Sequence, residues 1–150
     1  MRSGLAVCAI FLPTIAIAGG ADLVDGTWEG KGSFQLGGDV LTCSAIKMQF
    51  EGTSTRFVVR DASMICGDGP EQKFPQNDTF DVTPSGEVFH KGVKAGSIVG
   101  AILTTGGPVE NGAVERHQYD RVGDLLFYTE YTGVPGQAPQ YSMVAILHRQ

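Results

Sequence analysis

The side chains that could support catalysis or metal binding are three histidines and a set of scattered carboxylates. The histidines, His90, His117 and His148, lie in separate segments and lack the i, i+2 or i, i+4 spacing of strong metal motifs. The acidic residues follow polar faces and turns, as Asp120 and Asp124 do, and do not form the paired carboxylates of acid–base hydrolysis. We therefore predict no metal centre and no catalytic residues, and expect a protein that is not an enzyme.

The first eighteen residues have the features of an export signal. Arg2 provides a short positive region, an apolar run follows over residues 5–17, and residues 16–18 have the small-x-small pattern of a cleavage site. The run is shorter than the roughly 20 residues that span a bilayer. We predict that residues 1–18 are a cleaved signal peptide, that residues 19–150 form one domain, and that the protein is secreted or periplasmic.

Two cysteines, Cys43 and Cys66, remain once the signal peptide is removed together with Cys8. An even pair in a chain bound for an oxidising compartment predicts a structural disulfide, whereas a redox pair would need a Cys-x-x-Cys motif. Strand alternation places Cys43 on the polar face, beside Lys47. We therefore expect the disulfide to lie outside the core, joining two neighbouring strands.

The composition excludes several classes of protein. The 150 residues include 11 basic and 16 acidic side chains, and a net charge of −5 gives no electrostatic footprint for nucleic acid. A hydrophobic content of 42% is too high for a disordered chain. Because 21 glycines and seven prolines imply many turns between short elements, an all-β domain is favoured.

Apolar residues alternate at period two along much of the chain, which predicts about nine strands and very little helix. The strands are expected over residues 27–36, 42–51, 55–66, 79–83, 87–91, 97–105, 113–121, 125–132 and 140–149. Residues 67–78, which include Phe74, are predicted to form the longest loop. Short connections favour a single antiparallel up-and-down β-barrel of about eight to ten strands over a sandwich, because closure removes exposed sheet edges.

Both ends of the chain resemble calycin barrels, the group that includes lipocalins, fatty-acid-binding proteins and nitrobindins. The segment Gly26-Thr27-Trp28-Glu29-Gly30-Lys31-Gly32 resembles their opening strand, and Ala145-Ile146-Leu147-His148-Arg149 is similar to their ending. The resemblance implies that Arg149 packs across Trp28 and closes the barrel, a cation over an indole face.

The Gly-Thr-Trp-x-Gly-x-Gly form is most similar to nitrobindins, which bind haem through a histidine just before this ending. In this chain residues 141–144 are Tyr, Ser, Met and Val, so the expected ligand is missing. His148 shares its strand parity with Ser142 and Val144, and we do not expect it to replace that ligand. We therefore predict no haem and no other cofactor, and the resemblance implies a fold more than an activity.

Large apolar residues on the strands are predicted to point into the barrel. Those expected to line a ligand-binding interior are Phe34, Met48, Phe50, Phe57, Val59, Met64, Phe80 and Phe127. They either fill the barrel as a dry core or, if Gly30, Gly32, Gly100 and Ala101 leave space, surround a hydrophobic cavity. Our leading hypothesis is a lipocalin-like protein that binds a small hydrophobic molecule without catalysis.

A protein-interaction module, such as a periplasmic protease inhibitor, is the alternative. Residues 67–78 would then be the loop that enters the protease, with Cys66 anchoring its base. An exposed Phe74 favours this hypothesis, whereas a Phe74 in the barrel mouth favours a ligand gate.

Overall fold

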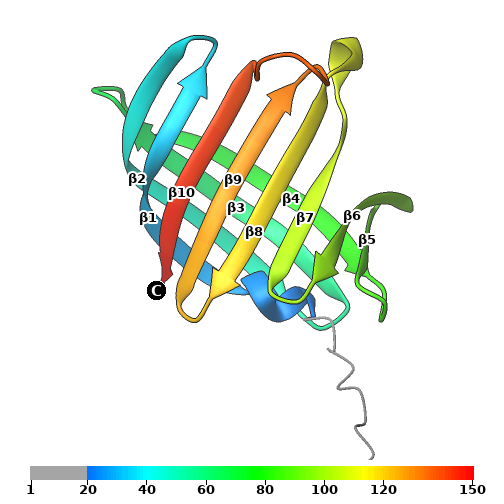
Figure 1. Cartoon of the computed structure of the whole chain (residues 1–150). Coiled ribbons are helices and arrows are strands. Elements are labelled where there is room, and N and C mark those ends of the chain that lie inside the picture. Colours follow the sequence, from blue (N-terminus) through cyan, green and yellow to red (C-terminus); the bar gives the residue numbers. More distant parts are fainter. Residues whose placement is uncertain (1–19) are drawn as a thin grey trace, which may run out of the picture.

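The computed structural model describes residues 20–150, so the predicted signal peptide lies outside the described residues. In this part of the chain, ten antiparallel strands form one closed up-and-down barrel in which β1 pairs with β10 (Figure 1). The strands are β1 (Gly26–Leu36), β2 (Asp39–Gly52), β3 (Arg56–Cys66), β4 (Gln72–Val82), β5 (Glu87–His90), β6 (Val93–Val99), β7 (Ile102–Pro108), β8 (Val114–Val122), β9 (Leu125–Gly133) and β10 (Tyr141–Arg149). Two short 3-10 helices, η1 (Ala21–Val24) and η2 (Glu110–Gly112), complete it, and neither has the length or apolarity to cross a membrane.

The predicted all-β barrel of about eight to ten strands is confirmed, and its tenth strand comes from a segment that was expected to form one strand. Residues 97–105 do not form a single strand, because the chain turns at Gly100 between β6 and β7. The φ angle of Gly100 is +60°, a left-handed conformation that glycine adopts at little cost. The β-branched residues on either side of the turn gave the appearance of one continuous strand.

The predicted loop over residues 67–78 is wrong for most of its length, because β4 begins at Gln72. This strand pairs with β3, with Phe74 opposite Ala62 and Phe80 opposite Phe57. Its first eight residues are exposed on both faces, so no apolar alternation marked them as a strand. Only residues 67–71 connect β3 to β4.

The disulfide between Cys43 and Cys66 is confirmed, and it joins β2 to β3 with an S–S distance of 2.01 Å. Cys43 is fully buried and Cys66 packs against the core, so the prediction that the bridge lies outside the core is wrong. The pairing of β2 with β3 shifts register between Cys43 and Ala45. Such a bulge reverses the alternation counted from Ile46, which brings Cys43 to the inner face.

One end of the barrel is closed around Trp28, whose indole is fully buried. Its Nε1–H donates a 2.7 Å hydrogen bond to the carbonyl of Val24 at the end of η1. The Arg149 guanidinium lies 5.9 Å from the ring centroid, where the resemblance implied it, and Arg121 lies 5.5 Å away. Arg121 also donates to the carbonyl of Leu23. Strands β1, β8 and β10 and helix η1 are thereby tied together at the closed end.

Candidate functional site

A cavity of about 470 Å³ lies inside the barrel and extends to the end opposite helix η1. Its lining comes from every strand from β2 to β10, and Val109 and Tyr141 line it near the open end. A volume of this size is typical of small-molecule sites. The barrel interior is therefore only partly filled by side chains.

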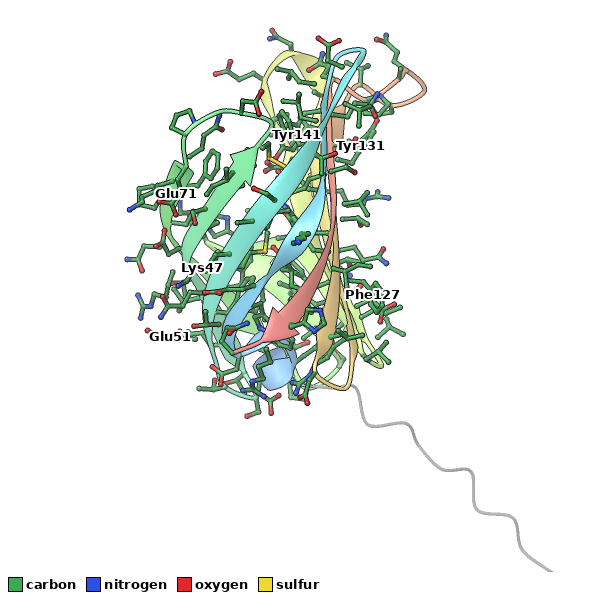
Figure 2. The ribbon with its side chains drawn as sticks, turned by 90° about the vertical axis from the view of Figure 1, so that its left-hand side faces the viewer. Lys47, Glu51, Glu71, Phe127, Tyr131 and Tyr141 are labelled. Atoms are coloured by element: carbon green, nitrogen blue, oxygen red, sulfur yellow. A yellow bond between two sulfur atoms is a disulfide. The ribbon has the colours of Figure 1, made fainter. Side chains whose placement is uncertain are left out.

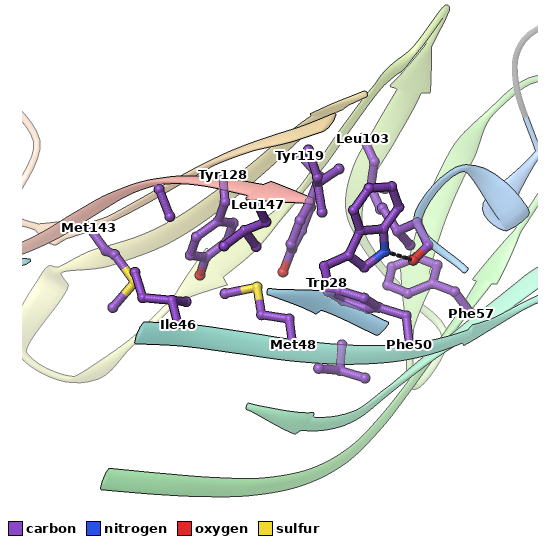
Figure 3. Packing of buried hydrophobic residues seen from close by; sticks show 14 of the residues in the cluster. Trp28, Ile46, Met48, Phe50, Phe57, Leu103, Tyr119, Tyr128, Met143 and Leu147 are labelled. Carbon is purple, nitrogen blue, oxygen red and sulfur yellow. Dashed lines mark hydrogen bonds between the residues drawn. The ribbon is translucent and has the colours of Figure 1, made fainter. Parts of the chain in front are cut away.

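The wall formed by β2, β3 and β4 is largely apolar. Its apolar lining residues are Ile46, Met48, Phe50, Val59, Ala62, Met64, Phe74 and Phe80. Figure 3 shows Ile46 and Met48 facing the hydroxyl ends of Tyr128 and Tyr119, which extend from the other side of the barrel. The cavity thus has an apolar side and a polar side.

The polar side is a cluster on β8, β9 and β10. Glu115 and His117 are two residues apart on the inner face of β8, and Glu130 of β9 pairs directly with His117. Tyr128 donates a 2.7 Å hydrogen bond to Oε2 of Glu130, and Tyr141 donates one of 3.0 Å to the same oxygen. We call these five residues the polar cluster.

Hydrogen-bond direction fixes the tautomer of His117. Its Nδ1 lies 2.9 Å from the Tyr128 hydroxyl, which donates its single hydrogen to Glu130. The hydroxyl must therefore accept the bond from Nδ1–H. In the neutral ring Nε2 therefore carries no hydrogen, and it faces Glu115 with 3.5 Å between Nε2 and Oε2; when the ring is protonated, Nε2 gains a hydrogen that it can donate to Glu115.

Burial and the neighbouring charges set the protonation of the polar cluster. Burial disfavours the charged form of His117, but the hydrogen bond to Glu115 and the charge of Glu130 outweigh this and raise the pKa of His117. The same hydrogen bond lowers the pKa of Glu115. Burial and the nearby Glu130 charge raise the pKa of Tyr141 well above its ordinary value, so its phenol is a neutral donor.

No lysine or arginine is among the described residues that line the cavity. A second acidic–histidine pair, Asp78 and His90, lies in the same lining with 3.6 Å between carboxylate and imidazole. Carboxylates are therefore in excess over permanent cations, and the cavity disfavours an anionic occupant.

The structure places most of the predicted interior residues inside the barrel. Those that line the cavity are Met48, Phe50, Val59, Met64 and Phe80. Phe57 is fully buried in the core and stacks on Phe80 with 4.6 Å between ring centroids. Phe34 is half-buried, with its ring 5.0 Å from that of Tyr141.

The prediction that Phe127 points into the barrel is wrong. This side chain is 38% exposed and lies on the outer face (Figure 2). Its neighbours Leu126 and Tyr128 are buried, so alternation along β9 directs Phe127 to solvent.

The glycines that were expected to leave space inside the barrel do not create the cavity. Gly30 and Gly32 face the backbone of β10, where a Cβ on Gly30 would lie 2.0 Å from the carbonyl oxygen of Ile146. They allow β1 and β10 to approach closely, and Gly100 and Ala101 lie in a turn. The small residues that line the cavity are Ala62, Ala95, Gly106 and Gly107.

Sequence reasoning missed the polar cluster because it considered the histidines and the carboxylates separately and did not compare the positions of one with those of the other. Two signals were available. Glu115 and His117 have i, i+2 spacing on one predicted strand, so they share a face. A hairpin turn at Gly123 and Asp124 pairs Val122 with Leu125, and counting outward from this pair places Glu130 opposite His117.

Comparison with known proteins defines the class of fold. No family model matches the chain, and no curated protein matches it. Among solved structures, the barrel is similar to the crystal structure of Rv2717c from M. tuberculosis, with a TM-score of 0.51 and 18% sequence identity over 85% of this chain and 93% of that one. This likeness shows a shared β-barrel fold, which is compatible with a calycin-like barrel.

Proposed function

We propose that this protein is a lipocalin-like barrel that binds a small, largely hydrophobic molecule in its interior without catalysing a reaction. The observation that carries the proposal is the 470 Å³ cavity with an apolar wall formed by β2, β3 and β4. The calycin-like residues at both ends of the chain support it. The disulfide indicates an oxidising environment outside the cytoplasm, which supports a secreted or periplasmic carrier.

The two sides of the cavity define the kind of ligand. An apolar body would pack against Met48, Phe50 and Phe80, and a polar end would face Glu130 and His117. Because carboxylates outnumber permanent cations in the lining, we expect a neutral or cationic ligand rather than a fatty-acid anion.

The hydrogen bonds of the polar cluster support a binding role over catalysis. Among residues 20–150, one hydroxyl is hydrogen-bonded to a histidine, and this hydroxyl is the phenol of Tyr128. Burial raises the pKa of Tyr128 well above its ordinary value, so the phenol is a poor nucleophile at neutral pH.

The position of Phe74 favours a ligand gate over an inhibitory loop. Its side chain is 40% exposed, belongs to β4, and lines the cavity. Because β4 takes up the rest of the expected loop, only residues 67–71 could enter a protease, and they contain no aromatic residue.

The proposal predicts that filling the cavity weakens binding of an apolar molecule. Ala62 is half-buried on the cavity wall, and Ala62→Phe would occupy space that a ligand needs. We expect the dissociation constant of N-phenyl-1-naphthylamine, a neutral fluorescent probe, to rise at least about tenfold, equivalent to about 1.4 kcal/mol.

The matched control is Val144→Phe, which adds an aromatic ring on the outer face, where Val144 is exposed. This variant should bind the probe with the affinity of the wild type. Equal affinities for the wild type and both variants would place the probe outside the cavity and contradict the proposal.

A further inference from the structure

The polar cluster contains a set of metal-ligating atoms that the packing of an apolar body against β2, β3 and β4 does not use. One carboxylate oxygen of Glu115, one ring nitrogen of His117 and one carboxylate oxygen of Glu130 all lie within 4.8 Å of one another. All three residues are half-buried and line the cavity. Imidazole nitrogen and carboxylate oxygen are ligands that Zn²⁺ takes in proteins.

Strand pairing fixes where these three residues lie relative to one another. Glu115 and His117 lie on one face of β8 at i, i+2, and Glu130 is the cross-strand partner of His117 on β9. Directly paired residues on neighbouring strands have Cβ atoms about 4.5 to 5.5 Å apart. The closed barrel therefore holds three ligand-bearing side chains on a rigid scaffold.

Neighbouring tyrosines orient two of the three ligands. Tyr128 accepts the hydrogen of His117 Nδ1, which leaves Nε2 as the ligating nitrogen. Histidine ligands in metal sites commonly donate their second ring N–H in this way. Tyr128 and Tyr141 both donate to Oε2 of Glu130, so Oε1 of that carboxylate is free to bind an ion.

A third tyrosine lies on the same wall as the polar cluster. Tyr119 is only 5% exposed, lines the cavity, and directs its hydroxyl toward the space between β8 and β2 (Figure 3). Its ring packs against that of Tyr128, with 5.1 Å between the ring centroids.

We propose that Glu115, His117 and Glu130 bind a divalent transition-metal ion of the Zn²⁺ type on the cavity wall. One nitrogen and two oxygen ligands suit Zn²⁺ or Co²⁺ better than Ca²⁺ or Mg²⁺, which prefer oxygen alone. Three protein ligands leave a fourth position open, and here that position faces the cavity. The ion site does not depend on the binding of an apolar molecule.

Isothermal titration calorimetry of Zn²⁺ binding to the mature protein, treated beforehand with a chelator, tests this proposal. We expect one ion per chain, with the dissociation constant raised at least about tenfold by Glu115→Gln and by His117→Ala. Tyr141→Phe removes one donor to Glu130 and should weaken binding by a smaller factor, as losses of supporting hydrogen bonds do. Circular dichroism should show that each variant keeps the barrel.

His90→Ala is the matched control, because His90 lines the same cavity beside Asp78 but lies outside the cluster. This variant should bind Zn²⁺ like the wild type, and Co²⁺ should give a visible absorption band that is lost in His117→Ala. Failure of the wild type to bind one Zn²⁺, or equal weakening by His90→Ala, would overturn the metal site.

The neutral probe separates this proposal from the proposed function. A protein that binds N-phenyl-1-naphthylamine but not Zn²⁺ lacks the metal site and keeps the carrier function. A protein that binds one Zn²⁺ through Glu115 and His117 but never binds the probe keeps the metal site and lacks the carrier function.

Discussion

Replacement of Trp28 by alanine is expected to lower the free energy of unfolding by about 3 to 5 kcal/mol, as large-to-small changes of buried aromatic residues do. The side chain is fully buried, and it contacts the end of η1 through the hydrogen bond to Val24. Its loss also removes the ring that Arg121 and Arg149 cover. A loss of this size is a large fraction of the stability of a small domain.

Thermal unfolding measures this effect when it is followed by circular dichroism at a wavelength that reports on β-strands. Fluorescence is not suitable, because Trp28 is the only tryptophan and its signal is lost in the variant. Trp28→Phe is the graded control. It keeps an aromatic ring but leaves the carbonyl of Val24 without its donor, so we expect a smaller loss of about 1 to 3 kcal/mol. An unchanged melting temperature in Trp28→Ala would contradict the closed end described here.

Removal of the disulfide is expected to lower the free energy of unfolding by about 3 kcal/mol. Cys43 and Cys66 are 23 residues apart, and their bond restricts the unfolded chain across the turn between β2 and β3. The effect should appear as a lower urea midpoint for the double variant Cys43→Ala, Cys66→Ala.

Reduction provides the control for this experiment. Dithiothreitol should lower the midpoint of the wild type and leave that of the double variant unchanged. If the double variant unfolds at the same urea concentration as the oxidised wild type, the disulfide does not contribute to stability and the account of its role is wrong.

The fold could be predicted from the sequence where one face of a strand is apolar. Met48 and Phe50 alternate with charged or polar residues on β2, and such strands with short turns indicate a barrel. The prediction failed at Cys43, because a bulge in the pairing of two strands leaves no mark on either sequence alone. It failed again over residues 72–78, where both faces of β4 are exposed.

The candidate site was less accessible to sequence reasoning. The inward position of Val59 follows from alternation, but Met64 has the opposite parity and points inward because the pairing of β3 shifts register between Val59 and Asp61. Whether such residues fill the barrel or leave a cavity depends on how strands approach one another. Gly30 shows this dependence, because the absence of its side chain brings β1 close to β10 instead of opening space. Cross-strand pairing of Glu130 with His117, in contrast, follows from the turn at Gly123 and was open to prediction.

The methionines of the barrel report directly on whether its cavity binds a small apolar molecule. The three methionines among residues 20–150, Met48, Met64 and Met143, all line the cavity. With methyl-¹³C-methionine labelling, titration of N-phenyl-1-naphthylamine should shift all three methyl resonances with one shared dissociation constant, and Ala62→Phe should suppress the shifts. Three resonances that stay in place at saturating probe would show that the cavity takes no apolar ligand and would contradict the account.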